Sequence, residues 1–440
     1  MTDRLHEIAR ACLEAGIDAA HPERVVGDAV THEQGTLAVG GRPPDGGPSA
    51  DRVRYRLADY DRLLVVGGGN AAGTAAAALE TVLGDAIDDG LVVSDVPVPT
   101  ERIDVCEGTH PVPGESAAAA TSRLTDLLAD AGEDTLVVAV VTGGASALLP
   151  APAEGLTLAD LRATTEALLA SGADIHEVNA VRKHCSASKG GGLAARAAPA
   201  TVVALLFSDV VGDDPAVIGS GPFAPDTSTL ADARAVLDRY DVDVPTAVRD
   251  HLETAAETPG PDDSTFASVT PRLLADGDTA AAAAAEAAGD HGFDPLVLST
   301  RVRGEAREAA TTHVAVAEQM RATGDPIAPP AVVVSGGETT VRREGAMAGT
   351  GGPNAEFALA AALELDVSEA VVAAVDTDGI DGNAETAGAS IDADTVTDET
   401  AARAALETHD AAGYLEDVGA TVHTGPTGTN VNDLRVVVLA

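Results

Sequence analysis

The sequence predicts an α/β protein of two domains with mainly parallel sheets. A chain of 440 residues is longer than one ordinary hydrophobic core requires. Short runs rich in Val and Leu alternate with Ala-rich segments of helical length. These runs are continuously apolar, which is typical of parallel strands that are buried on both faces of a sheet.

The apolar runs predict seven strands, and the Ala-rich segments predict five helices. The strands are expected at 62–67, 90–94, 135–141, 201–208, 294–298, 331–335 and 370–376. The helices are expected at 71–85, 115–131, 158–171, 279–291 and 305–323. The polar segment 257–264 is rich in Pro, Gly and Asp and is the predicted linker. We therefore expect one domain at 1–258 and a second at 265–440.

Acidic residues dominate the charge of the chain, with 70 acids against 27 bases and a net charge of −43. The acids are spread along the chain, so we expect a solvated shell on a protein from a halophile. At about 1 M salt the Debye length is only ~3 Å, which screens the self-repulsion of such a surface. The charge also argues against nucleic-acid binding, because no basic patch is available for phosphates.

Cysteine usage and the N-terminus favour a cytoplasmic protein. Cys12, Cys106 and Cys185 are odd in number and widely spaced, without a CxxC or zinc-site spacing. The N-terminus lacks a basic region followed by an apolar core, and no apolar stretch reaches 18 residues. We expect neither secretion through a standard signal nor a membrane span.

Lysine is almost absent, since Lys183 and Lys189 are the only lysines among the 27 basic residues. A composition that avoids lysine should keep it where a compact ammonium is needed and an arginine fork does not serve. The pair therefore indicates a functional site, and the alternative is a chance pair on a solvated helix end.

Three glycine-rich segments follow predicted strands: LLVVGGGNAAG (63–73), VTGGASAL (141–148) and SGGETTV (335–341). The first satisfies the dinucleotide fingerprint GxGxxA at Gly67, Gly69 and Ala72. Free amides at such turns can receive an anion, although similar turns also serve close packing. Their repetition predicts a ligand site at the carboxyl edge of the sheets.

Acidic side chains also follow predicted strands. Asp209 comes after the strand at 201–208, while Asp378 and Asp381 follow the strand at 370–376. Such carboxylates can bind Mg²⁺ or accept a hydroxyl proton, although most acids in this chain are expected to be solvated. His110, in a proline-braced turn, is expected either to contact substrate or to be structural. The sequence shows no HExxH, GxSxG or Walker GxxxxGK[ST] motif.

Together these segments resemble the bacterial-type glycerate 2-kinase family, also called hydroxypyruvate reductase-like or MOFRL proteins. The resemblance runs in order from about residue 60 to the C-terminus. It rests on GTHPVP (108–113), TGGASALL (142–149), SGADIHEVNAVRKHCS (171–186), SKGGGLA (188–194), SDVVGDD (208–214), SGP (220–222), PDTST (225–229), SGGETTV (335–341), TDGIDG (377–382) and TGPTGTNVND (424–433).

The resemblance implies two α/β domains with a cleft between them, and a kinase that uses ATP and Mg²⁺. It implies phosphorylation of D-glycerate to 2-phosphoglycerate, or of a related small hydroxy acid. The expected partners are this acid and the nucleotide, with a homodimer as an option and no nucleic acid or membrane.

The resemblance also implies roles for individual residues. Catalysis is expected from Asp209, Lys189 and Asp378, and substrate binding from Ser146, Asn179, Arg182 and Lys183. Metal binding is expected from Asp209, Asp378 and Asp381. Nucleotide binding is expected from Gly67, Gly69, Gly143, Gly144, Ser335, Gly336, Gly337, Glu338 and Thr339.

Two positions depart from the family pattern. Asn70 stands where the family has a lysine, and GGPNAE (351–356) replaces GGRNQE, which puts Pro353 in the place of an arginine. Phosphoryl transfer depends on positioning and on electrostatic stabilisation, so two lost cations matter. The alternatives are a degenerate or substrate-shifted paralogue and, from GxGxxA and the older family label, a nicotinamide-dependent hydroxypyruvate reductase.

Overall fold

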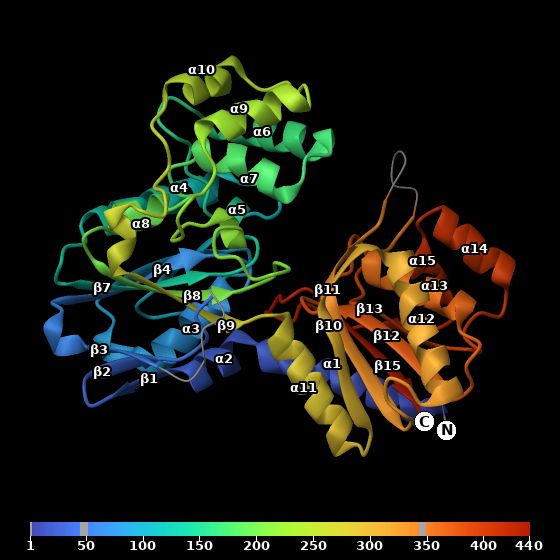
Figure 1. Cartoon of the computed structure of the whole chain (residues 1–440). Coiled ribbons are helices and arrows are strands. Elements are labelled where there is room, and N and C mark those ends of the chain that lie inside the picture. Colours follow the sequence, from blue (N-terminus) through green and yellow to red (C-terminus); the bar gives the residue numbers. More distant parts are fainter. Residues whose placement is uncertain (1, 45–51, 343–348) are drawn as a thin grey trace. The chain divides into compact units, whose positions relative to one another are not determined.

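The computed structural model describes residues 2–44, 52–342 and 349–440 (Figure 1). The chain divides into two compact units. The parallel unit consists of Val25–Ser208 and Asp213–Leu274. The mixed unit consists of Met1–Arg24, Asp209–Gly212 and Ala275–Ala440.

The parallel unit contains a six-stranded sheet of order β6-β5-β4-β7-β8-β9. Its strands are β4 (Arg62–Gly68), β5 (Asp89–Ser94), β6 (Asp104–Glu107), β7 (Thr135–Val141), β8 (Thr201–Phe207) and β9 (Val269–Ala275). The pairs from β6 through β8 are parallel. Connecting helices include α3 (Ala72–Leu83), α4 (Glu115–Ala129), α5 (Ala145–Leu148) and α8 (Gly192–Ala197). The continuous apolar runs fit this sheet because β7 is buried along its whole length.

Smaller elements complete the parallel unit. The antiparallel strands β1 (Val30–Glu33), β2 (Thr36–Val39) and β3 (Val53–Arg56) follow α2 (Pro22–Ala29). Four further helices, α6 (Leu158–Ser171), α7 (Ile175–His184), α9 (Leu230–Arg239) and α10 (Thr246–Thr254), share a core of their own. Leu168, Val181 and Leu237 lie at the centre of that core, each almost fully buried.

The mixed unit contains a second six-stranded sheet, of order β10-β11-β15-β12-β13-β14. The strands are β10 (Asp294–Glu305), β11 (Ala331–Thr340), β12 (Ala370–Asp376), β13 (Gly388–Asp392), β14 (Thr421–Val422) and β15 (Asp433–Leu439). β10 and β11 are parallel, whereas every other neighbouring pair is antiparallel. The α/β class is confirmed, but the expectation of a mainly parallel sheet is wrong here. Burial on both faces makes a strand continuously apolar whatever its direction, so the pattern could not reveal strand direction.

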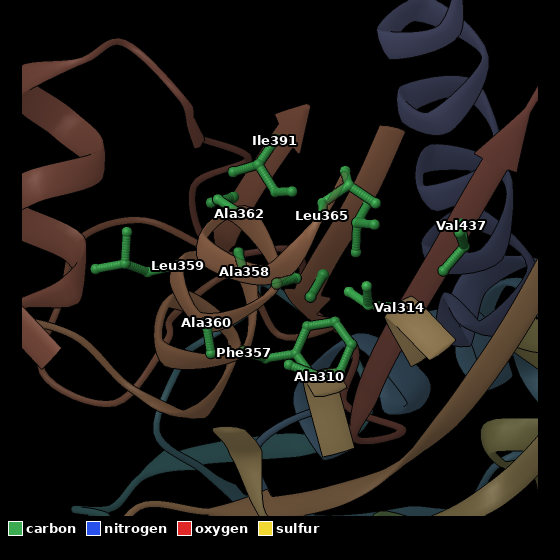
Figure 2. Packing of buried hydrophobic residues seen from close by; sticks show 14 of the residues in the cluster. Ala310, Val314, Phe357, Ala358, Leu359, Ala360, Ala362, Leu365, Ile391 and Val437 are labelled. Atoms are coloured by element: carbon green, nitrogen blue, oxygen red, sulfur yellow. The ribbon is translucent and has the colours of Figure 1, made fainter. Parts of the chain in front are cut away.

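Helices cover both faces of the mixed sheet. The helices are α1 (Thr2–Ala20), α11 (Gly277–Asp290), α12 (Ala306–Thr323), α13 (Pro353–Glu364), α14 (Glu399–Glu407) and α15 (Ala411–Asp417). Figure 2 shows Phe357 of α13, Val314 of α12 and Val437 of β15, which belong to one cluster of buried hydrophobic residues. On the other face, α1 comes so close that a Cβ on Gly16 would lie 2.4 Å from Leu434 Cδ2. Glycine at position 16 therefore permits the contact between this helix and the sheet.

The units differ from the predicted domain ranges at both ends. The first 24 residues belong to the mixed unit, and the parallel unit extends to Leu274. The predicted linker is bonded into the parallel unit, where Glu257 accepts from the Leu230 amide at 2.8 Å and Thr258 donates to Asp226 at 2.9 Å. Its Pro and Gly content marks a loop, and loops of that composition occur inside domains as well as between them.

Among the described residues, no helix combines the length and apolar character needed to cross a membrane. The predicted cleft between the two domains stays a prediction.

Candidate active site

A cavity of about 280 Å³ in the parallel unit gathers several of the predicted site residues. Ser146, Arg182 and Lys189 line it together with His110 and Gly144. The rest of its lining is mixed: apolar residues such as Leu161, Leu169 and Pro150 alternate with the polar residues Arg162, Thr164, Thr165, Glu166 and Ser186. The cavity therefore combines cationic groups and hydroxyls with apolar surface, which suits a small polar ligand that carries a negative charge.

Helix α7 and the loop after it supply the cations Arg182 and Lys189. Asp174 and Glu177 form a capping box at the start of α7, and Arg182 lies in its last turn, where the helix dipole favours positive charge. Lys189 Nζ donates to the carbonyl oxygens of Ser146 at 2.8 Å and Leu149 at 3.4 Å. Burial and the nearby charge of Arg182 lower the pKa of Lys189 to about 7. Burial also lowers the pKa of Arg182.

Ser146 and Asn179 belong to one hydrogen-bonded group although they lie far apart in sequence. Ser220 Oγ lies 2.7 Å from Ser146 Oγ and donates to Asn179 Oδ1 at 3.0 Å. Ser220 and Asn179 are almost fully buried, so Ser146 is the member that reaches the cavity.

Lys183 does not line the cavity. Its ammonium forms a buried ion pair with Asp226 at 3.1 Å. Asp226 also accepts hydrogen bonds from Ser228 and Thr258. The two lysines of the chain thus have different surroundings, and we interpret Lys183 as a structural residue because its charge is already neutralised.

The glycine turns after β4 and β7 pack closely against each other. Gly67 and Gly69 adopt φ of 147° and 136°, and Cβ atoms there would lie about 2 Å from Val140 O and Thr142 Oγ1. The Asn70 amide donates to Gly143 O at 2.8 Å. A Cβ on Gly144 would lie 2.0 Å from Asn70 Oδ1. Close packing explains Gly67, Gly69 and Gly144, and the nucleotide role of these residues and of Gly143 stays a prediction.

The third glycine segment is not a turn. Ser335, Gly336, Gly337, Glu338 and Thr339 all lie within β11, which continues to Thr340. The register of β10 shifts twice opposite this stretch, and a Cβ on Gly337 would lie 2.3 Å from Val302 O. The prediction of a turn here is wrong, because the glycines serve close strand pairing beside a bulge.

Carboxylates collect in the mixed unit where β11 and β12 end and β15 begins. Asp376 pairs in register with Asp433, which pairs with Gly337. Asp209 is half-buried, and its desolvation, together with the charge of Asp378, raises its pKa to about 6. Burial and the carboxylates of Asp378 and Asp433 raise the pKa of Asp376 well above its usual value. The carboxylates of Asp376, Asp378 and Asp209 thus disfavour one another's ionisation, while Asp433 is paired with the buried Arg435.

Asp381 accepts backbone amides at the start of a helix. Its carboxylate accepts the amides of Gly352, Asn354 and Ala355 at 2.8–3.0 Å, at the start of α13. It thus caps a helix N-terminus and leaves little capacity for a metal ion. Among the described residues no group of three or more His, Cys, Asp or Glu could hold a metal ion. The metal role of Asp209, Asp378 and Asp381 stays a prediction.

Comparison with known proteins places this arrangement in a family. Residues 8–253 match the domain of unknown function DUF4147, and residues 331–433 match the MOFRL family. A glycerate 2-kinase of Pyrococcus horikoshii is 35% identical over 99% of this chain and 97% of its own length. The chain belongs to the glycerate 2-kinase family.

Further relatives carry two different names. A protein of Agrobacterium vitis named putative hydroxypyruvate reductase is 43% identical over 86% of this chain and 87% of its own length. The crystal structure of glycerate kinase from Thermotoga maritima covers 100% of both chains with 34% identity and a TM-score of 0.83. The fold of the whole chain is thus that of a solved glycerate kinase.

The two departures from the family pattern lie at well-defined places. Asn70 is half-buried against Gly144, and its Oδ1 is buried without a hydrogen-bond partner. Pro353 is the first residue of α13, where proline is favoured because its missing amide would have no helical partner. Proline thus suits the helix start, whereas the Oδ1 atom of Asn70, which stands in the place of the family lysine, has no hydrogen-bond partner among the described residues.

Sequence reasoning missed several residues of these sites. Ser220 lies in the SGP segment, and its position between two glycines is a signal for an unusual backbone. Arg162 lines the cavity from α6. Asp376 and Asp433 were missed because their strand ends become neighbours only when β12 and β15 pair.

Proposed function

We propose that this protein transfers a phosphoryl group from ATP, with Mg²⁺, to the 2-hydroxyl of D-glycerate or a related small hydroxy acid. Its enzyme class, a kinase, follows from the family. The observation that carries the proposal is the cavity of the parallel unit, where Arg182 and Lys189 provide positive charge beside the Ser146 hydroxyl. A small acid with a carboxylate and a neighbouring hydroxyl matches these groups.

We assign the carboxylate of the acid to Arg182 and Lys189 and its hydroxyl to Ser146. An ammonium in a partly apolar cavity interacts strongly with anions, because little water is present to screen it. We regard Lys189 as catalytic, since its charge can also offset the negative charge that a phosphoryl group brings to the acid.

We assign the nucleotide and its Mg²⁺ to the carboxylate-rich edge of the mixed unit. Glu338 and Thr339 lie at the end of β11 beside Asp433. Asp209 and Asp378 repel each other, and a divalent cation would relieve this repulsion. Mg²⁺ commonly uses one or two carboxylates together with phosphate oxygens and water, so these two residues suffice. When bound, Mg²⁺ supplies charge neutralisation on the phosphates.

A coupled assay with D-glycerate, ATP and Mg²⁺ in molar KCl tests the proposal. The wild type should form 2-phosphoglycerate, and Lys189→Met should lower kcat/KM by roughly a hundredfold or more. Gln34→Gly, in the hairpin between β1 and β2, serves as the control. Reduction of hydroxypyruvate by a nicotinamide cofactor without any phosphorylated product would contradict the proposal.

A second candidate is a substrate-shifted or inactive paralogue, and the observation that favours it is the unpaired amide oxygen of Asn70. If the lost cations limit the rate, Asn70→Lys should raise glycerate phosphorylation by up to about a hundredfold. Pro353→Arg, measured separately, should act in the same direction. Nucleotide binding without turnover of any hydroxy acid, in the wild type and both variants, would favour the inactive paralogue.

A further inference from the structure

Ser220 occupies a backbone position that would suit glycine. Its φ is 62°, in the left-handed region, and its neighbours Gly219 and Gly221 have φ of 58° and 67°. A serine in this region is strained, whereas glycine adopts it readily. The side chain that causes the strain is completely buried and consists of a single hydroxyl. Such strain persists where the side chain has a use, and its use is visible in its hydrogen bonds.

The segment around Ser220 is bonded to the loop that carries Lys189. The amide of Gly190 donates to Ser220 O at 3.0 Å, and the amide of Gly191 donates to Gly221 O at 2.7 Å. A Cβ on Gly219 would lie 2.8 Å from Ala145 Cβ, so the segment also comes close to the residue before Ser146. Ser220 is thereby placed between the serine and the lysine of the cavity.

The count of protons decides the direction of the hydrogen bonds. A hydroxyl has one proton, and Ser220 donates it to Asn179 Oδ1. The bond between Ser146 and Ser220 must then be donated by Ser146. Because its proton is used, Ser146 offers only lone pairs to the cavity. It can accept a hydrogen bond from a hydroxyl but cannot donate one to a carboxylate.

We infer that Ser220 is a positioning residue that holds Ser146 as a hydrogen-bond acceptor for the hydroxyl of the bound hydroxy acid. Arg182 and protonated Lys189 have only N–H donors, and they take the carboxylate. The cavity then distinguishes the two groups of its ligand, because hydrogen-bond donors face the carboxylate and an acceptor faces the hydroxyl. This inference rests on the proposed function and adds the source of hydroxyl selectivity to it.

Calorimetric titration without nucleotide tests the inference with two ligands, D-glycerate and 3-hydroxypropanoate, which lacks the 2-hydroxyl. The wild type should prefer D-glycerate strongly, because a site built to bond a hydroxyl rejects the analogue that lacks it. Ser220→Gly removes the hydroxyl and the strain together, so it should melt no lower than the wild type. Its preference for D-glycerate should fall about tenfold, the size expected for one hydrogen bond.

Two further variants complete the experiment. Ser220→Ala should lose the same selectivity, and Gln34→Gly, which also replaces a residue of positive φ, should keep the wild-type preference. Unchanged selectivity in Ser220→Gly, or no preference in the wild type, would overturn the inference. A large loss of melting temperature in both Ser220 variants would assign Ser220 a structural role instead. Selective binding without phosphorylation would overturn the proposed function and leave the role of Ser220 standing.

Discussion

Lys189 is an ammonium buried in a cavity that already holds a guanidinium. Burial and Arg182 lower the pKa of Lys189 to about 7, so in the empty protein it is charged below that pH and neutral above it. A bound carboxylate would stabilise the charged form and raise the pKa again. Binding of the acid should therefore be accompanied by uptake of a proton when the pH lies above about 7.

We accordingly predict that affinity for the hydroxy acid falls as the pH rises through about 7. Titration calorimetry in two buffers of different ionisation enthalpy measures the proton uptake. Lys189→Met should bind roughly ten- to a hundredfold more weakly and show no such pH dependence, because a charged hydrogen bond is lost. Retention of the pH dependence in Lys189→Met would assign the titration to another group.

Lys183, the other lysine of the chain, is expected to affect stability, in contrast to Lys189, which is expected to affect ligand binding. Removal of one partner from a buried ion pair leaves the other charge uncompensated, which costs about 3–5 kcal/mol. Lys183→Met should therefore lower the free energy of unfolding by about that amount, as measured by urea denaturation in high salt. Replacement of both partners by apolar residues, Lys183→Met with Asp226→Leu, should recover much of the loss. A stability equal to that of the wild type in Lys183→Met would show that the pair is not structural.

At the scale of elements, the first turn of α13 depends on a residue outside the helix. Asp381 accepts three amides of that turn, and no other acceptor is provided within the helix itself. Asp381→Ala should cost roughly 3 kcal/mol, because buried donors left without acceptors carry a penalty of about 1–3 kcal/mol each. Asp378→Ala should lower the melting temperature much less than Asp381→Ala does. It should, however, abolish Mg²⁺-dependent turnover. Equal stability losses in the two variants would contradict this division of roles.

The carboxylate-rich edge of the mixed unit predicts a coupling between pH, Mg²⁺ and stability. The folded-state pKa of Asp209 is raised to about 6 from an ordinary value of 3.8. A carboxyl group with a raised pKa contributes stability below the ordinary value and loses that contribution as the pH rises through about 6. Mg²⁺ that neutralises the charge should restore it.

We expect Mg²⁺ to raise the melting temperature at pH 7.5 and to have little effect near pH 5, where Asp209 is protonated. Asp209→Asn should reduce the effect of Mg²⁺ on the melting temperature at pH 7.5. All measurements are made at high KCl, so that added Mg²⁺ hardly changes the ionic strength, and any Mg²⁺ effect that remains in this variant is non-specific. An equal Mg²⁺ effect at both pH values would contradict the assignment of Mg²⁺ to this edge.

For the molecule as a whole, net charge is the dominant physical property. A net charge of −43 produces self-repulsion that opposes the compact state unless salt screens it. We predict loss of secondary structure when KCl is lowered from molar concentration to about a tenth molar, followed by circular dichroism. A melting temperature that is the same at both concentrations would contradict the halophilic interpretation. The halophilic source, the cytoplasmic location and the homodimer stay predictions.

Local patterns in the sequence determined much of the fold. The strands at 135–141 and 370–376 and the helix at 158–171 have the predicted bounds. A strand buried on both faces is apolar throughout, and a helix start is marked by its own capping residues, such as Thr157 and Asp160. The cavity residues Ser146, Arg182 and Lys189 were also predicted, because the segments that carry them resemble the family.

Tertiary structure alone decided the properties that depend on distant partners. The direction of β12 and β15 depends on which strands pair, and the same apolar sequence serves either direction. The structural role of Lys183 depends on its ion pair with Asp226, which lies 43 residues away in the sequence. Asp381 became a helix cap, and Ser220 came to lie between Ser146 and Asn179, only when separate segments met. A local pattern records which residue types are present, whereas charge compensation and hydrogen-bond direction are set by neighbours that the chain brings together on folding.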